Sequence, residues 1–186
     1  MIRIVGAISL DRCIGYYPNG LHKKGRLPWE PEEAQVDLEH FKEVTSGPKS
    51  IVIMGRKTFE SINFITLPGR YNIVVSRKSI KEAENLHWED SLDAAISHCR
   101  RNYPSKEGWN INFIGGTQVF SEGMRFANEI ILTIIPIKSY ERYDTDQLVY
   151  FPDIPNNFVR TECKAHSNNN NLLLVKYQRR KGKGKC

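Results

Sequence analysis

Three short apolar runs place the strongest constraint on the fold of this 186-residue chain. Residues 51–54, 72–75 and 130–135 are almost entirely Ile, Val, Leu and Met, with no alternation of polar and apolar side chains. Continuous runs of this kind are typical of strands buried on both faces, as in parallel sheets covered by helices. They therefore predict an α/β fold with a mostly parallel central sheet.

Helical patterns alternate with the apolar runs. The predicted strands span 2–8, 50–54, 71–76, 111–115, 129–135, 158–164 and 172–178. The predicted helices, about four flanking the sheet, span 31–45, 56–63, 91–102 and 117–127. No helix precedes the last strand, which favours an antiparallel pairing there. Residues 15–28 are predicted to form a long polar loop and 168–171 a polar turn.

The net charge of +6 is concentrated at the carboxyl end. Residues 176–186 hold six of the 27 Lys and Arg residues and none of the 21 Asp and Glu residues, so the rest of the chain is neutral. The length suits one domain, which we place at 1–180. We expect 181–186 to be a basic flexible tail, although contact with nucleic acid remains an alternative.

The cysteines and the hydropathy of the chain indicate the cellular compartment in which it works. The four cysteines are scattered, with no C-x-x-C pair, which argues against a zinc site or a disulfide framework. This usage favours a reducing cytoplasm. No apolar run approaches the roughly 18 residues of a membrane-spanning helix, and the first residues are too mixed for a signal peptide. We therefore expect a cytoplasmic protein without membrane contact.

One carboxylate lies within the apolar stripe of the first predicted helix. Asp37 shares that stripe with Ala34, Leu38 and Phe41. A carboxylate facing a core is costly unless it is paired, protonated or turned towards a polar ligand. The pattern alone fits a functional acid, an amphipathic edge residue or a structural ion pair. Thr133, the only polar residue of the 130–135 run, could offer it a hydroxyl.

The predicted strand ends carry basic residues and glycines. Arg56 and Lys57 open a helix, where two cations oppose the macrodipole unless an anion binds. Arg77 follows the next strand, and Gly115 and Gly116 allow a ligand to approach the backbone. Adjacent carboxyl ends of parallel strands are where nucleotides bind, and arginine suits the extra phosphate of NADPH, where NADH takes an acid. The strand ends thus predict an NADPH site.

Seven motifs occur in a specific order along the chain. They are Asp11-Arg12-x-Ile14-Gly15, Leu27-Pro28-Trp29, Asp37-Leu38-x-x-Phe41-Lys42-x-x-Thr45, Met54-Gly55-Arg56-Lys57-Thr58-Phe59-Glu60-Ser61-Ile62, Leu67-Pro68-Gly69-Arg70, Ile114-Gly115-Gly116 and Phe151-Pro152-Asp153. This combination, over about residues 1–180, resembles the dihydrofolate reductase family. The resemblance implies a single-domain oxidoreductase that uses NADPH to reduce 7,8-dihydrofolate to 5,6,7,8-tetrahydrofolate for one-carbon metabolism and thymidylate synthesis. It also implies a monomer that binds antifolate inhibitors and needs no metal.

The resemblance assigns roles around the substrate. Asp37 would hold the amino group and ring nitrogen of the pterin and promote protonation at N5, while Trp29 and Thr133 order water around it. Arg70 would bind the glutamate tail, and Lys42 is either an aid at the pocket mouth or a solvated cation. The apolar walls would be Val5, Leu38, Phe41, Ile62, Leu67 and Ile114.

The resemblance also assigns a cofactor site. Ala7 and Ile14 would hold the nicotinamide amide through their backbones, Gly115-Gly116 would form a cis peptide, and loop 15–28 would act as a lid. The remaining cofactor residues would be Gly15, Gly55, Arg56, Lys57, Thr58, Ser76, Arg77, Thr117, Gln118, Val119 and Phe120. The chain departs from familiar members at Phe120, where tyrosine is usual, at Gln118, which replaces a basic residue, and at His40.

Two other functions remain as alternatives. One is the pyrimidine reductase of riboflavin synthesis, which also uses NADPH; Trp29, Asp37 and Arg70 argue against it because they address a pterin and a glutamate tail. The other is a non-catalytic binding protein on the same fold whose basic tail contacts nucleic acid. The intact Asp37 and the retained glycines argue against that loss of activity.

Overall fold

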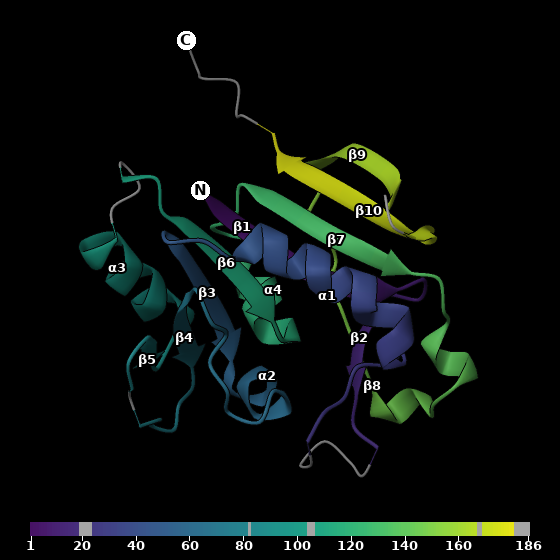
Figure 1. The fold of residues 1–186 in the computed structure, drawn as a ribbon, viewed down its shortest axis with the longest axis horizontal. Helices are drawn as coiled ribbons and strands as arrows, with labels where there is room; N and C mark the ends of the chain where they lie inside the picture. The colour runs from purple at the N-terminus through teal and green to yellow at the C-terminus, as the bar shows by residue number, and fades with distance from the viewer. Residues whose placement is uncertain (19–23, 82, 104–106, 167–168, 181–186) are drawn as a thin grey trace.

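The computed structural model describes residues 1–18, 24–81, 83–103, 107–166 and 169–180 (Figure 1). Its strands are β1 (Ile2–Ser9), β2 (Cys13–Tyr16), β3 (Ser50–Gly55), β4 (Tyr71–Val75), β5 (Leu86–Glu89), β6 (Asn110–Gly115), β7 (Glu129–Ile135), β8 (Leu148–Tyr150), β9 (Phe158–His166) and β10 (Asn169–Arg179). Its helices are α1 (Pro31–Thr45), α2 (Arg56–Ser61), α3 (Leu92–Asn102) and α4 (Thr117–Gly123), with short 3-10 turns η2 (Ser139–Glu141) and η3 (Thr145–Gln147).

Eight strands form one sheet in the order β5-β4-β3-β6-β1-β7-β10-β9. The six strands from β5 to β7 pair in parallel. The last two, β10 and β9, pair antiparallel to their neighbours. A separate two-stranded sheet joins β2 to β8. The expected α/β fold, with a mostly parallel sheet, an antiparallel carboxyl-terminal strand and four helices, is confirmed.

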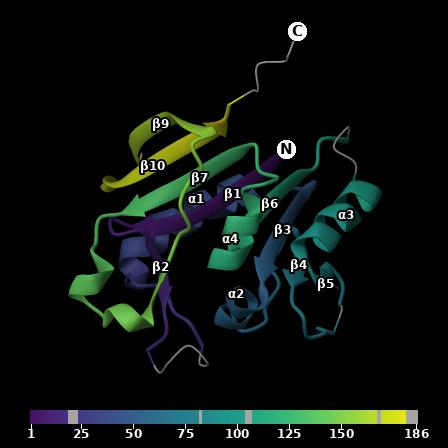
Figure 2. The same ribbon diagram turned by 180° about the vertical axis from the view of Figure 1, so that it is seen from behind.

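Both faces of the central strands are buried, which explains their continuous apolar sequences. In β3, Ile51 and Ile53 belong to a core cluster with residues of α3 and α4, whereas Val52 and Met54 pack with Phe59 of α2 on the other side. Helix α1 lies over β1 and β7, in front of them in Figure 1 and behind them in Figure 2. Alternate residues of one strand therefore support two different layers of helices.

Several boundaries differ from the sequence-based expectation. Residues 15 and 16 of the predicted loop belong to β2, and the predicted turn at 168–171 is strand from residue 169 onward. Helix α2 ends at Ser61, two residues early, because the following Asn63 and Phe64 adopt positive φ angles of 59°. Helix α4 ends at Gly123 and not at 127. Most of the loop 15–28 is described, except 19–23, and the predicted tail 181–186 lies outside the described residues.

In the described part of the chain, no helix combines the length and the apolar character needed to cross a membrane.

Candidate functional site

The candidate acid is held between helix α1 and strand β7. Asp37 is 8% exposed, and Thr133 of β7 is 2% exposed and hydrogen-bonded to its carboxylate. Burial raises the pKa of Asp37 above its ordinary value, and the Thr133 hydrogen bond and the charge of His166 only partly oppose this. Among residues whose burial is described, Asp37 is the only buried acid. The expected pairing of Asp37 with Thr133 is therefore present.

Trp29 lies just before α1 and is also buried. Its ring packs with Ile135, Ile137 and Leu172, on the same apolar cluster that Ala7 and Val36 border. The indole Nε1 is buried and has no hydrogen-bond acceptor among the described residues. Buried indole donors usually have a partner, so this N–H is suited to donate to a bound molecule or a water.

The candidate site contains one buried cation. Arg70 is 7% exposed; its Nε donates to the Pro68 carbonyl at 3.0 Å and its Nη1 to the Thr45 hydroxyl at 2.9 Å. Burial lowers the pKa of Arg70. In the described chain no carboxylate forms an ion pair with it, and no other Lys or Arg is buried. A buried guanidinium held in place by neutral acceptors is suited to receive a carboxylate from a ligand.

The expected apolar walls do not all share one environment. Val5 of β1 is buried, and Ile62, Leu67 and Ile114 are half-buried beside the cluster of Val52, Met54 and Phe59. Phe41 is half-buried on α1, whereas Leu38 is 54% exposed and Lys42 is exposed. Leu27, Phe64 and Ile65 are likewise exposed apolar side chains. Leu38 therefore belongs to the surface and not to the packed interior.

The three strand ends that the sequence singled out are neighbours. Strand β3 lies between β4 and β6, with Gly55 opposite Val75 and Met54 opposite Gly115. The Gly115-Gly116 peptide is cis, as the resemblance implies. A Cβ atom added at Gly115 or Gly116 would lie 3.4 or 3.5 Å from the Thr58 hydroxyl. The glycines thus let the end of β6 approach the first turn of α2.

Two of the three cations at these strand ends, Arg56 and Lys57, already have partners in the protein. Arg56 forms an ion pair with Glu60 at 2.6 Å, one helical turn along α2. Lys57 lies 4.9 Å above the ring of Tyr17. Arg77 is exposed, and the neighbouring Ser76 hydroxyl donates to the Lys78 carbonyl at 2.7 Å. The two cations at the start of α2 therefore do not depend on a bound anion alone. Glu60 and Tyr17 already offset part of their positive charge.

The start of α4 completes this edge of the sheet. The hydroxyl of Thr117 donates to the Tyr150 carbonyl at 3.0 Å, and the Gln118 amide donates to Glu122 at 2.8 Å. Val119 and Phe120 are buried. The Phe120 ring stands against Phe151, with centroids 5.0 Å apart, and reaches under Gly6 and Gly115. Phe120 therefore fills this position through apolar packing.

The two expected amide-holding residues lie on different sheets. Ala7 of β1 is opposite Thr133 in the register of β7, which puts its backbone next to the partner of Asp37. Ile14 is in β2, and Gly15 follows it, where a Cβ would lie 3.2 Å from the Arg26 carbonyl. The β2 strand therefore fixes the beginning of the predicted lid.

Sequence reasoning missed a histidine pair beside Asp37. His166, at the end of β9, is 6% exposed, and its ring meets that of His40 edge to face with centroids 5.6 Å apart. Burial is the main cause of the lowered pKa of His40. His40 lies one turn after Asp37 and gave a weak signal, but His166 is remote in sequence and no spacing could predict it.

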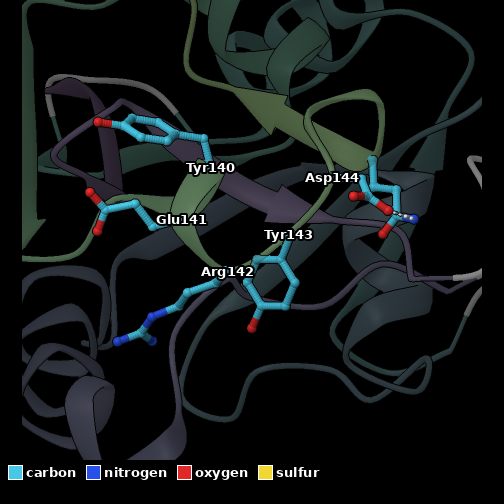
Figure 3. Close-up of a pocket in the computed structure, with 6 residues that line it drawn as sticks. Tyr140, Glu141, Arg142, Tyr143 and Asp144 are labelled. Carbon is cyan, nitrogen blue, oxygen red and sulfur yellow. Dashed lines mark hydrogen bonds between the residues drawn. The ribbon is translucent and has the colours of Figure 1, made fainter.

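A surface hollow lies apart from these residues. It is formed by the η2–η3 segment that follows β7 (Figure 3). It contains neither Asp37 nor any of the strand ends. Its lining residues are Tyr140, Glu141, Arg142, Tyr143, Asp144 and Gln147.

Comparison with known proteins assigns the family. The family profile described as dihydrofolate reductase matches residues 1–179. A dihydrofolate reductase of Buchnera aphidicola is 36% identical over 152 residues, which cover 82% of this chain and 79% of that protein. The type 3 enzyme of Salmonella typhimurium is 36% identical, covering 73% and 72%, and a dihydrofolate reductase of Neisseria meningitidis is 29% identical, covering 96% and 98%. This chain therefore belongs to the dihydrofolate reductase family.

Proposed function

We propose that this chain reduces 7,8-dihydrofolate to 5,6,7,8-tetrahydrofolate with NADPH. One observation carries the proposal. Among the residues with described burial, Asp37 is the only buried acid and Arg70 is the only buried Lys or Arg, and these two side chains form no ion pair with each other. An unpaired buried charge is costly, so a ligand that supplies both partners is strongly favoured. Dihydrofolate has an amino-substituted pterin at one end and a glutamate carboxylate at the other.

Asp37 has the central role in this proposal. Its carboxylate accepts hydrogen bonds from the pterin amino group and ring nitrogen and promotes delivery of a proton to N5. The pKa of Asp37 is raised by burial, which favours the protonated carboxyl and so supports general-acid assistance. Trp29 and Thr133 orient the water that connects the carboxylate to the ring. NADPH, when bound, would supply the hydride that adds to C6; with the proton that adds to N5, the overall reaction would convert one NADPH and one proton into NADP⁺ and the reduced product.

The other substrate contacts follow from the same arrangement. Arg70 takes a tail carboxylate through its guanidinium, with Thr45 and Pro68 holding the side chain in place. Lys42 lies exposed on the last turn of α1, and its proposed role is to assist at the mouth of the site; a solvated cation is the alternative. The ring system lies among apolar side chains contributed by Val5, Leu38, Phe41, Ile62, Leu67 and Ile114.

For the cofactor, membership of the family implies a nicotinamide nucleotide, and we propose that it is NADPH. Arg77 supports this choice because it is exposed at the end of β4 and has no ion pair within the described chain. Arg56 and Lys57 add positive charge nearby, and the backbones of Ala7 and Ile14 hold the nicotinamide amide. The rest of the cofactor contacts come from Gly15, Gly55, Thr58, Ser76, Gly115, Gly116, Thr117, Gln118, Val119 and Phe120.

We further propose a cytoplasmic monomer with one catalytic domain over 1–180. Three cysteines of the described chain, Cys13, Cys99 and Cys163, are free thiols, which agrees with a reducing compartment. Classical antifolates, as analogues of the pterin, are expected to compete with dihydrofolate for Asp37. The basic residues 181–186 are proposed to be dispensable for catalysis.

The direct test follows nicotinamide absorbance with the purified chain. We expect oxidation of NADPH that depends on dihydrofolate and yields tetrahydrofolate, with much slower turnover on NADH. The aminopyrimidine substrate of riboflavin synthesis is the matched control and should give no turnover. Turnover of that pyrimidine, or tight salt-sensitive binding of nucleic acid without any reductase activity, would overturn the proposal.

A further inference from the structure

A second group of ionisable side chains lies at the opposite end of the sheet from β9 and β10. His87 and Glu89 are two residues apart on edge strand β5, so they face the same side, and His98 comes from helix α3. One ligand atom from each lies within 4.8 Å of the other two. Figures 1 and 2 show α3 and β5 at one edge of the molecule, away from α1.

The contacts inside this cluster centre on one carboxylate oxygen. Oε1 of Glu89 is 3.0 Å from Nε2 of His87 and 3.4 Å from Nδ1 of His98. The two rings are stacked, with centroids 3.9 Å apart and planes inclined by 25°. The three side chains are 14–21% exposed. An ion from solvent can therefore reach them, while most of each side chain is shielded by protein.

The adjacent cysteine does not belong to the cluster. Cys99 is fully buried, and burial together with the charge of Glu89 raises the pKa of its thiol to about 12. The ligand atoms that lie within 4.8 Å of one another belong to His87, Glu89 and His98, and the Cys99 thiol is not among them. The available donors are two imidazoles and one carboxylate.

We propose that His87, Glu89 and His98 bind one divalent transition-metal ion of the zinc class. Imidazole and carboxylate donors suit Zn²⁺, Co²⁺, Ni²⁺ and Cu²⁺, whereas Mg²⁺ and Ca²⁺ prefer sites made of oxygen. Ligand distances of about 2.0–2.2 Å require the stacked rings to open slightly, so that both nitrogens point at the ion. Water completes the coordination, because the protein supplies three donors.

The ion would join an edge strand to the helix that covers it. The same strand end is already tied to β4: the Ser76 N–H donates to the Glu89 carbonyl at 2.9 Å, and the Trp88 indole donates to the Ser76 carbonyl at 2.7 Å. The site is structural and independent of Asp37. Its failure would leave the proposed reductase activity untouched.

Titration of the metal-free full-length chain with Co²⁺ and Zn²⁺ tests the proposal. We expect visible d–d bands that saturate at one Co²⁺ per chain and disappear on addition of Zn²⁺. A hundredfold excess of Zn²⁺ over its Kd should raise the melting temperature by roughly 5–10 °C. Glu89→Gln and His98→Gln should each weaken Zn²⁺ binding by about a hundredfold, whereas Glu84→Gln, at an exposed acid before β5, should not change it.

Three results would overturn the assignment. Absence of saturable Co²⁺ bands in the unmodified chain would show that the cluster is a set of ion pairs only. Undiminished binding in Glu89→Gln and His98→Gln would place the metal elsewhere. If these variants fail to fold, His87→Asn, at the more exposed imidazole, provides the same comparison, and unchanged Zn²⁺ affinity there would also contradict the site.

Discussion

The substrate side and the cofactor side of the site hold their charges differently. Around α1, Asp37 and Arg70 are buried and have mainly neutral hydrogen-bond partners. At the ends of β3 and β4, the cations are partly or fully exposed, and Arg56 and Lys57 contact Glu60 and Tyr17. Buried charges interact strongly with a ligand, whereas exposed ones are screened by water and salt. Substitutions on the substrate side should therefore have the larger effects.

The largest effect is expected for Asp37→Asn. Asparagine keeps the shape of the side chain but cannot supply a proton or a negative charge, so kcat/KM for dihydrofolate should fall by about 10²–10⁴-fold. The dissociation constant of NADPH, measured by fluorescence titration, should change little because the groups that act on the Asp37 carboxylate are Thr133 and His166, and not the strand-end cations proposed to bind the cofactor phosphates. Turnover by Asp37→Asn close to that of the unmodified enzyme would contradict the proposed catalytic role of Asp37.

Arg70→Ala should have the next largest effect. Loss of a charge-assisted bidentate contact, worth about 1.5–3 kcal/mol, should raise KM for dihydrofolate by roughly 10–100-fold with a smaller change in kcat. Since Arg70 also holds Thr45 and Pro68, a thermal melt of the variant must accompany the kinetics. A substrate analogue that lacks the glutamate tail is the control: its KM should not respond to the substitution.

Arg77→Ala tests the cofactor side. An exposed contact to phosphate is worth about 1 kcal/mol or less at physiological salt, so NADPH affinity should weaken up to about fivefold. NADH affinity should stay constant, because NADH lacks the additional phosphate. Measurements at low and physiological salt should show the effect shrinking with ionic strength, and an equal loss for both cofactors would contradict the proposed role.

The buried acid also predicts a pH dependence of stability. The pKa of Asp37 is raised in the folded state above its ordinary value of 3.8, so folded protein binds this proton more tightly than unfolded protein. The resulting stabilisation is complete below pH 3.8 and is lost as the pH rises through the folded pKa. Asp37→Asn should therefore increase the melting temperature at neutral pH, and the gain should shrink in acid. An increase in melting temperature that does not vary with pH would mean that burial does not raise the pKa of Asp37.

The smallest effect is expected from removal of residues 181–186. The last strand, β10, ends at Arg179, and Arg179 itself donates to the Ala127 carbonyl at 2.8 Å. The contacts that hold the end of β10 in place therefore do not involve residues 181–186. Melting temperature and kcat/KM at physiological salt should be nearly unchanged. A large drop in melting temperature or a tenfold loss of kcat/KM would assign the segment a structural or functional role.

Long apolar runs made most of the fold predictable from sequence. Strands such as β3 and β7 are buried on both faces, and their sequences are therefore almost entirely apolar, without alternation. The strands β2, β5 and β8 were not predicted, because three or four residues are too few to show the hydrophobic periodicity of a strand. Their existence depends on partners far along the chain, such as β8 for β2.

The site was predictable where a polar residue interrupted an apolar pattern. Asp37 and Thr133 stood out in this way, and the structure brings them together. The Arg56–Glu60 pair was accessible in principle, since residues four apart on a helix are neighbours. The positions of Tyr17 over Lys57 and of His166 near Asp37 depend on tertiary packing and leave no local signature.

The central claim, that Asp37 delivers catalytic assistance at the pterin, is tested most directly by single-turnover hydride transfer. Enzyme saturated with NADPH is mixed with dihydrofolate across a range of pH, using the unmodified chain and Asp37→Asn. The account predicts that the Asn variant is slow at neutral pH and gains about tenfold for each unit of acidification, because solvent must then supply the N5 proton. A hydride-transfer rate in Asp37→Asn that equals that of the unmodified chain at neutral pH, and does not change with acid, would contradict it.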